Sequence, residues 1–193
     1  VGGSGLSLHF QPKIELPTGR VTGVEALLRW STPQGNIPPM DFIPVAEDTG
    51  LILPLGRWVL RAACDAALRF PGLRMAVNIS PRQFRDPAFV SSVRTVLSES
   101  GLAPDVLEIE ITEGVVMQDT ATTLSTFAEL KKLGVRISLD DFGTGYSSLS
   151  YLTRFRVDQL KIDRSFVKDL RDQNNEAIVS AIIALSNNLH LDV

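Results

Sequence analysis

Residues 138–149 read SLDDFGTGYSSL, in which a short apolar strand runs into two adjacent carboxylates and then into a glycine-rich loop. Carboxylates side by side at the end of a buried strand repel each other and lose hydration, so they persist where a positive charge lies between them. A divalent metal ion held by Asp140 and Asp141 is the simplest candidate. The alternative is ordinary turn chemistry, in which Asp141 caps the following helix and Asp140 is solvated.

The composition is that of one large folded domain. The chain has 193 residues, of which 44% are hydrophobic and 21% are charged, and its formal net charge is -3. A net negative charge is unlike the basic surface that binds long nucleic acids, so any anionic ligand is expected to be small and held locally. The one cysteine, Cys64, excludes an internal disulfide bond and is expected to be a buried small side chain.

The two ends of the chain read differently from its middle. Residues 1–5, VGGSG, are typical of a linker, and we assign residues 6–193 to one domain. No segment has the length of a membrane span or the features of a signal peptide. Because the sequence begins with Val and ends where an apolar strand could start, at 190–193, we expect it to be part of a longer protein.

Predicted strands and helices alternate along the chain. The strands at 6–16 and 21–30 are separated by the turn PTGR and are expected to form a hairpin. Further strands are predicted at 74–79, 106–111, 135–139 and 159–162. Helices are predicted at 40–47, 55–70, 89–97, 121–133, 149–155 and 176–189. In the second helix, the apolar stripe consists of Trp58, Ala62, Ala66 and Phe70.

Alternating strands and helices imply parallel pairing, which either a doubly wound sheet or a barrel provides. Polar residues favour the barrel, because each lies in or at the end of a separate predicted strand. These residues are Glu25, Asn78, Glu110, Asp140 and Lys161. The C-terminal ends of the strands of a parallel barrel converge on one mouth, where such residues can meet. An open sheet would place them in a row.

The segment 108–113, EIEITE, has two glutamates on one face of a predicted strand. In an amphipathic antiparallel sheet, Glu108 and Glu110 would form the solvated face. In a parallel barrel both faces are covered, so carboxylates on one face need a ligand or a partner. Position then selects Glu110 over Glu108, because Glu110 is nearer the C-terminal mouth.

The candidate site contains oxygen donors only. Glu25, Asn78, Glu110, Asp140 and Asp141 include no clustered His or Cys, which favours Mg²⁺ or Mn²⁺ over zinc. Two adjacent aspartates allow one carboxylate to bridge two ions. Two metal ions roughly 3.5–4 Å apart are a standard means of attacking phosphate esters, since they generate hydroxide, orient the ester and neutralise the developing charge.

Two basic residues complete the candidate site. Lys161, in LKID, is expected to point into the mouth, where it could orient the attacking water and stabilise negative charge. A salt bridge from Lys161 to Asp140 or Asp141 is compatible with that role. Arg29 lies beyond Glu25, where its planar donor fork could reach a phosphate oxygen, unless it is a surface arginine. On residue chemistry alone, Lys161 could also be the Schiff-base amine of a barrel lyase.

Together these motifs resemble those of EAL domains, the bacterial phosphodiesterases specific for cyclic di-GMP. The similar segments, in the family's order, are QPK at 11–13, EALLRW at 25–30, NIS at 78–80, EITE at 110–113, DDFGTGYSSL at 140–149 and KIDRSF at 161–166. The resemblance covers the chain from about residue 6 onwards. It implies an α/β fold, a (β/α)8 TIM-type barrel with an antiparallel first strand, that hydrolyses cyclic di-GMP to linear pGpG with two Mg²⁺ or Mn²⁺ ions.

Carried over motif by motif, the resemblance assigns roles to individual residues. Metal ligands would be Glu25, Asn78, Glu110, Asp140 and Asp141. Catalytic residues would be Lys161, which assists the attacking water, Glu25, and Glu113, which braces the loop after Asp141. Substrate contacts would be Gln11, Arg29, Ser80 and Asp163.

The resemblance also carries expectations about the whole protein. Family members form dimers near the loop that follows Asp141, and many are fused to sensory or diguanylate-cyclase-like domains. We therefore expect a homodimer and a cytoplasmic location for this module. In some family members, the parent protein is tethered to a membrane.

The sequence departs from the family pattern at its C-terminal end. Family members continue with a strand that carries an Ala-Glu-Gly-Val-Glu-like motif and then a Gln-Gly motif, and neither motif is in this sequence. The resemblance therefore implies a C-terminally incomplete domain, without its last barrel strands and one active-site glutamate. The alternative function is a non-catalytic domain that binds cyclic di-GMP. Such domains usually lose metal ligands, whereas this chain retains each ligand position that it spans.

Overall fold

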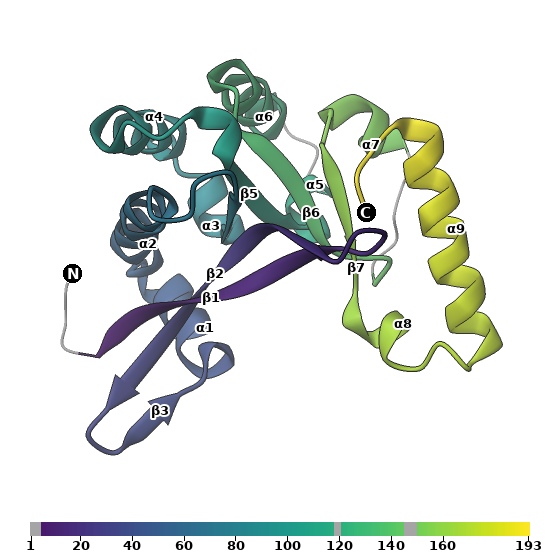
Figure 1. The fold of residues 1–193 in the computed structure, drawn as a ribbon. Helices are drawn as coiled ribbons and strands as arrows, with labels where there is room; N and C mark the ends of the chain where they lie inside the picture. Colours follow the sequence, from purple (N-terminus) through teal and green to yellow (C-terminus); the bar gives the residue numbers. More distant parts are fainter. Residues whose placement is uncertain (1–4, 118–120, 145–149) are drawn as a thin grey trace.

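A curved seven-stranded sheet with helices packed along one side forms the framework of the molecule (Figure 1). The computed structural model describes residues 5–117, 121–144 and 150–193. The strands are β1 (Leu6–Glu15), β2 (Arg20–Thr32), β3 (Gly35–Ile37), β4 (Arg74–Asn78), β5 (Leu107–Thr112), β6 (Arg136–Phe142) and β7 (Gln159–Ile162). Their order in the sheet is β1-β2-β4-β5-β6-β7, and β3 pairs with β2.

Strand β1 is antiparallel to β2, and the strands that follow β2 along the sheet are parallel. β1 and β2 form the predicted hairpin. From β2 the sheet continues through β4, β5, β6 and β7 in parallel register. At least one helix follows each of these parallel strands, which is the repeated unit of a TIM-type barrel. The predicted fold class, with its antiparallel first strand, is therefore confirmed.

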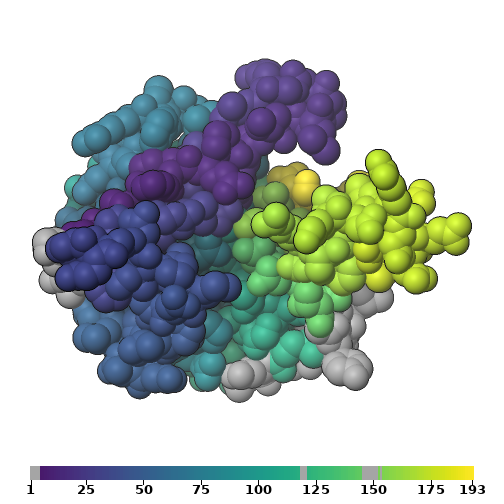
Figure 2. Space-filling view, turned by 90° about the horizontal axis from the view of Figure 1, so that it is seen from below, coloured from purple at the N-terminus to yellow at the C-terminus, as the bar shows by residue number. Residues whose placement is uncertain are grey.

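The two ends of the described chain lie at opposite ends of the sheet. Seen from below, the blue segment with α1 is on one side and the yellow-green segment with α8 and α9 is on the other, while the purple hairpin of β1 and β2 extends along the top of the view (Figure 2). A parallel bridge between Gln159 and Asp192 continues the pairing beyond β7. The predicted linker at residues 1–5 lies, apart from Gly5, outside the described residues.

The helices are α1 (Pro39–Thr49), α2 (Ile52–Ala67), α3 (Pro81–Phe84), α4 (Phe89–Ser100), α5 (Glu113–Val116), α6 (Ala121–Leu133), α7 (Ser150–Phe155), α8 (Arg164–Lys168) and α9 (Gln173–Leu189). The sequence did not predict β3, α3, α5 or α8, because elements of three to five residues are too short to show a hydrophobic period. Within the described residues, every helix falls short of the length and apolar character that a bilayer crossing requires.

The strands separate an apolar layer from a polar one. Ile109 of β5 and Ile137 and Leu139 of β6 are almost completely buried on the side of the helices. Burying one such side chain stabilises the fold by about 1.5–3 kcal/mol. Because side chains alternate along a strand, Glu110 and Ser138 point to the opposite, inner side of the sheet. The inner side of this sheet is therefore where charged groups collect.

Helix α2 buries a different stripe from the one predicted. Its buried residues include Val59, Ala63 and Ala67, whereas the predicted stripe through Trp58 and Ala62 is only half-buried. The helix packs against both β4 and α4, so its apolar surface is wider than a single stripe. The positions of β4 and α4 therefore determine which part of that surface is buried.

Cys64 is expected to resist thiol reagents in the folded protein. Its side chain is buried, as predicted, and burial together with the nearby charge of Asp65 raises the pKa of the Cys64 thiol to about 12. Since the thiolate is the reactive form, Ellman's reagent in mildly alkaline buffer should not react with the native protein. It should titrate one thiol per chain in concentrated guanidinium chloride. Rapid stoichiometric labelling of the native protein would contradict the burial of this residue.

Candidate active site

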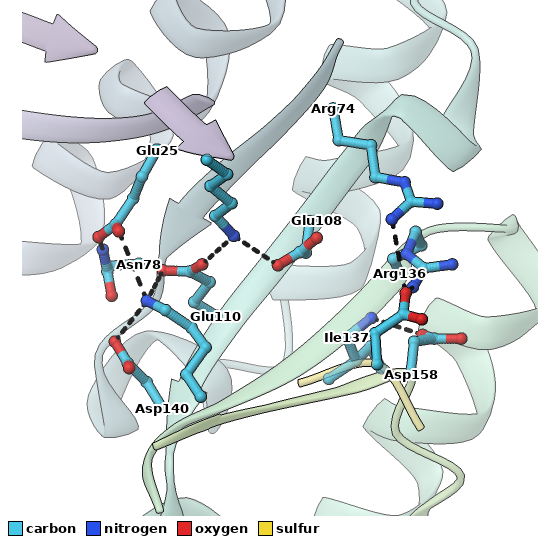
Figure 3. Close-up of polar contacts among 12 residues, drawn as sticks. Glu25, Arg74, Asn78, Glu108, Glu110, Arg136, Ile137, Asp140 and Asp158 are labelled. Atoms are coloured by element: carbon cyan, nitrogen blue, oxygen red, sulfur yellow. Dashed lines mark hydrogen bonds and ion pairs between the residues drawn. The ribbon is translucent and has the colours of Figure 1, made fainter. Parts of the chain in front are cut away.

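Polar side chains from five parallel strands converge where the pairing of these strands ends (Figure 3). Lys161 Nζ of β7 lies 2.7 Å from Glu110 Oε2 of β5, 3.0 Å from Asp140 Oδ2 of β6 and 3.5 Å from Glu25 Oε2 of β2. Asn78, at the end of β4, donates from Nδ2 to Glu25 Oε1 at 2.7 Å. The five polar residues that the sequence places at separate strand ends therefore lie together.

The register of the sheet explains this convergence. Asn78 pairs directly with Glu110 across β4 and β5, and Asp140 pairs with Thr112 across β5 and β6. Residues that pair across parallel strands point to the same side of the sheet. A side chain near the end of each strand is thereby added to one cluster, although the members are far apart in the sequence.

Burial and charge oppose each other within the cluster. Glu110 is fully buried, and burial raises the pKa of its carboxyl group, although the ammonium groups of Lys161 and Lys13 lower that pKa in part. Burial by itself would lower the pKa of Lys161, but the carboxylates of Glu110 and Asp140 outweigh it and hold the pKa above its usual value. Lys161 is therefore a permanent cation at neutral pH. A Schiff-base lyase needs a neutral amine, so these surroundings disfavour that reaction.

Asp140 and Asp141 lie at an irregularity in the pairing of β6 with β7, between Leu139 and Phe142. Asp141 has a φ of 54°, a left-handed conformation that Asp adopts more readily than most residues. Burial and the charges of Asp140 and Asp163 raise the pKa of Asp141. Asp140 contacts Lys161, so the alternative of a merely solvated Asp140 is wrong.

A second lysine lies behind the cluster. Lys13 Nζ of β1 is 2.6 Å from Glu110 Oε1 and 2.8 Å from Glu108 Oε1. The sequence placed Lys13 only within the QPK motif and set Glu108 aside. No pattern in the sequence indicated this contact, because β1 is separated from β5 by two strands of the sheet.

The residues present fit a hard divalent cation. Three carboxylates already face one positive charge, and an amide oxygen donor lies beside them. Within the described residues, no three His, Cys, Asp or Glu side chains have the arrangement of a metal centre. Lys161 Nζ lies 2.7–3.5 Å from these carboxylate oxygens, in the place between them that a cation would take. A metal ion in that place would require the ammonium group to shift.

The predicted substrate contacts are distributed around this cluster. Gln11 is exposed on β1 and pairs with Glu25. Arg29 and Ser80 line a mainly apolar cavity of about 360 Å³ that also reaches Asn78 and Glu110. Arg29 Nη1 donates to its neighbour's carbonyl, Leu28 O, at 2.9 Å.

Two further predicted residues lie at helix starts. Asp163 caps α8, and its side chain accepts hydrogen bonds from the backbone and hydroxyl of Ser165. Those hydrogen bonds are the main reason that the pKa of Asp163 is lowered. Glu113 is buried in the first turn of α5. The loop that Glu113 was predicted to brace includes residues 145–149, which lie outside the described residues.

Gly56→Ala is expected to destabilise the wall of the cavity. A Cβ atom at this position would lie 1.7 Å from Gln83 Nε2. The Gln83 side chain accepts a hydrogen bond from the Ser80 backbone and completes the cap of α3. Loss of such a cap costs about 0.5–2 kcal/mol, which denaturant unfolding can measure. Gly114→Ala, in α5, is the control, because Thr112 Oγ1 would be 4.0 Å from its new Cβ atom. Equal effects of both substitutions would contradict the explanation.

The comparisons with known proteins agree with this geometry. A family model described as EAL domain matches residues 2–193, so the chain belongs to the EAL domain family. The chain is 48% identical over 195 residues to the bifunctional diguanylate cyclase/cyclic di-GMP phosphodiesterase MucR of Pseudomonas aeruginosa, with 97% of this chain and 28% of MucR covered. It is 42% identical over 194 residues to the cyclic di-GMP phosphodiesterase PdeR of Escherichia coli, with 97% and 29% covered.

Solved structures show the same fold. A structure of PaMucR phosphodiesterase in complex with c-di-GMP superposes with a TM-score of 0.92 at 47% identity, over 97% of this chain and 78% of that chain. The FimX EAL domain from Pseudomonas aeruginosa bound to c-di-GMP gives a TM-score of 0.88 at 27% identity, over 97% and 77%. The chain spans about a quarter of the length of the curated relatives it matches.

Proposed function

We propose that this chain supplies the catalytic site of a cyclic-di-GMP phosphodiesterase, which hydrolyses one phosphodiester bond to give linear pGpG. The observation that carries the proposal is the cluster of Glu25, Asn78, Glu110 and Asp140 around Lys161, beside a cavity. Several relatives bear the name of this enzyme, which supports the substrate.

Two Mg²⁺ or Mn²⁺ ions would be held by Glu25, Asn78, Glu110 and Asp140, together with the adjacent Asp141. When bound, the ions would activate water and neutralise charge on the phosphate. The oxygen donors suit these ions. With Lys13 and Glu108 included, four carboxylates face two ammonium groups, so negative charge remains in excess. The cluster therefore has the charge to hold a further cation.

Lys161 acts as a hydrogen-bond donor and a fixed positive charge. Its raised pKa makes it unsuitable as a general base at neutral pH. Once the carboxylates bind another cation, the ammonium group is free to donate to the attacking water or to a phosphate oxygen. Asn78 holds Glu25 in orientation through its 2.7 Å hydrogen bond. The apolar wall formed by Ile43 and Leu55 offers a surface for a purine base.

The activity can be tested with purified protein that contains this chain. Cyclic di-GMP is incubated with Mn²⁺ or Mg²⁺, and the nucleotides are separated by liquid chromatography. The proposal expects pGpG with either metal and none after chelation by EDTA. Absence of pGpG under both metals would contradict the enzymatic function.

A regulatory domain that binds cyclic di-GMP without cleaving it is the second candidate. It is favoured by the position of the Lys161 ammonium group, which lies between the carboxylates of Glu25, Glu110 and Asp140. Isothermal titration calorimetry without added metal distinguishes the two candidates. A receptor binds cyclic di-GMP tightly in EDTA and leaves it intact after Mn²⁺ is added, whereas an enzyme converts it.

We further propose a cytoplasmic homodimer whose parent protein carries sensory or diguanylate-cyclase-like domains. The greater length of the relatives and the bifunctional name of MucR support the further domains, and the resemblance to the family is the basis for the dimer and the location. Light scattering coupled to size-exclusion chromatography tests the dimer, and a monomeric mass at micromolar concentration would contradict it.

A further inference from the structure

Glu110 is held by two lysines from opposite sides. Lys161 contacts Glu110 Oε2 at 2.7 Å, and Lys13 contacts Glu110 Oε1 at 2.6 Å. Lys13 also contacts Glu108 Oε1 at 2.8 Å. The side chains of Glu110 and Glu108 are 0% and 2% exposed, so water does little to orient either carboxylate. Each oxygen of Glu110 therefore has its own ammonium partner.

Lys13 reaches this position across two strands. β2 and β4 lie between β1 and β5 in the sheet. The residue of β2 that pairs with Lys13 is Gly23, and the residue of β4 that pairs with Glu108 is Ala76. These small residues leave room on the inner side of the sheet for a long side chain. The pairing of β1 with β2 also shifts register directly after Lys13, and such bulges redirect side chains.

Stability alone does not explain a buried Lys13–Glu108–Glu110 group. Replacing a buried ion pair with apolar residues of similar size is often neutral or stabilising, because desolvation of the charges offsets their attraction. Hydrogen-bond partners behind a metal-binding carboxylate, in contrast, fix its orientation and strengthen binding. Lys13 touches Glu110 on the oxygen that faces away from Asp140 and Lys161.

We propose that Lys13, anchored by Glu108, is a positioning residue that directs Glu110 Oε2 towards the bound cation of the candidate active site. This inference rests on the proposed function, because it gives Glu110 the role of a metal ligand. Glu108 holds the Lys13 ammonium group in place and balances part of its charge. Neither residue touches the substrate.

Three variants test the proposal. Lys13→Met removes the ammonium group and keeps the length of the side chain, and Lys13→Arg restores a cation. The double variant K13M/E108L replaces the pair with apolar residues and leaves no unpaired charge at Glu108. Lys131→Met is the matched control, because Lys131 forms a similar 2.7 Å pair with Asp158 away from the site. Circular dichroism and thermal unfolding establish that each variant is folded.

The readout is binding of Mn²⁺ to the whole protein, followed by the electron paramagnetic resonance signal of free Mn²⁺, without substrate or turnover. Loss of a partner behind a metal ligand weakens metal binding by about 10–100-fold. We expect that loss in K13M and in K13M/E108L, recovery to within about threefold in K13R, and wild-type binding in K131M.

The outcomes separate this inference from the proposed function. Wild-type affinity in K13M/E108L would show that the pair only balances charge and would overturn the positioning role. If K13M does not fold, the double variant decides, since it has no unpaired buried charge at position 108. Failure of the wild-type protein itself to bind Mn²⁺ would overturn the proposed metal site and this inference with it.

Discussion

Glu25→Ala is expected to lower kcat for hydrolysis of cyclic di-GMP on the order of 10³-fold while the fold is retained. The Glu25 carboxylate is one of the three that face Lys161, and its other oxygen accepts the hydrogen bond from Asn78. Its removal deletes a ligand and releases the amide that orients it. The measurement is the rate of pGpG formation at saturating Mn²⁺, with circular dichroism on the same sample.

Glu15→Ala is the matched control for this substitution. Glu15 is an exposed glutamate at the far end of the same hairpin, where it accepts a hydrogen bond from Thr18. Its replacement should leave turnover within about twofold, since surface substitutions of this kind have small effects. Near-normal turnover of Glu25→Ala would remove Glu25 from the catalytic site.

Lys161→Met is expected to reduce kcat by about 10²–10³-fold, because it removes a fixed donor at the position where negative charge develops. It should also make the protein more dependent on a divalent cation. Without the ammonium group, the carboxylates of Glu110, Asp140 and Glu25 repel one another. Added Mn²⁺ should therefore raise the Tm of Lys161→Met by more than it raises the Tm of the wild-type protein.

Thermal unfolding with and without Mn²⁺ measures this second effect independently of turnover. Lys132→Met is the control, since Lys132 is an exposed lysine whose pair with Glu129 is on the surface of α6. Its response to Mn²⁺ should equal that of the wild-type protein. If Mn²⁺ raises the Tm of Lys161→Met by the same amount as that of the wild-type protein, the account is contradicted. That result would mean that the ammonium group and Mn²⁺ do not neutralise the same three carboxylates.

The cluster at the strand ends could be predicted because the sequence pattern within each strand determines where its members lie. A period of two along each strand fixes which side a residue faces, and parallel pairing brings the strand ends together. That reasoning selected Glu110 and Asp140 without any knowledge of distances. The orientation of Asp141 could not be predicted, because it depends on the irregular pairing of β6 with β7 and on a left-handed backbone conformation.

The contact of Lys13 with Glu108 and Glu110 could not be predicted in this way. In the sequence, Lys13 is 95 positions from Glu108 and 97 positions from Glu110. Their strands, β1 and β5, are not neighbours in the sheet. Their meeting depends on the curvature of the sheet and on small residues at Gly23 and Ala76. The buried stripe of α2 was misjudged for a related reason, since several of its stripes are apolar and only the packing of neighbouring elements selects one.

Anomalous diffraction from crystals grown with Mn²⁺ and cyclic di-GMP tests the central claim most directly, because it locates the ions without relying on turnover. The expected result is anomalous density between the carboxylates of Glu25, Glu110 and Asp140, with a phosphate of the nucleotide beside it and the Lys161 ammonium group displaced. Bound nucleotide with no anomalous density at this cluster would contradict the assignment of these residues as the metal site.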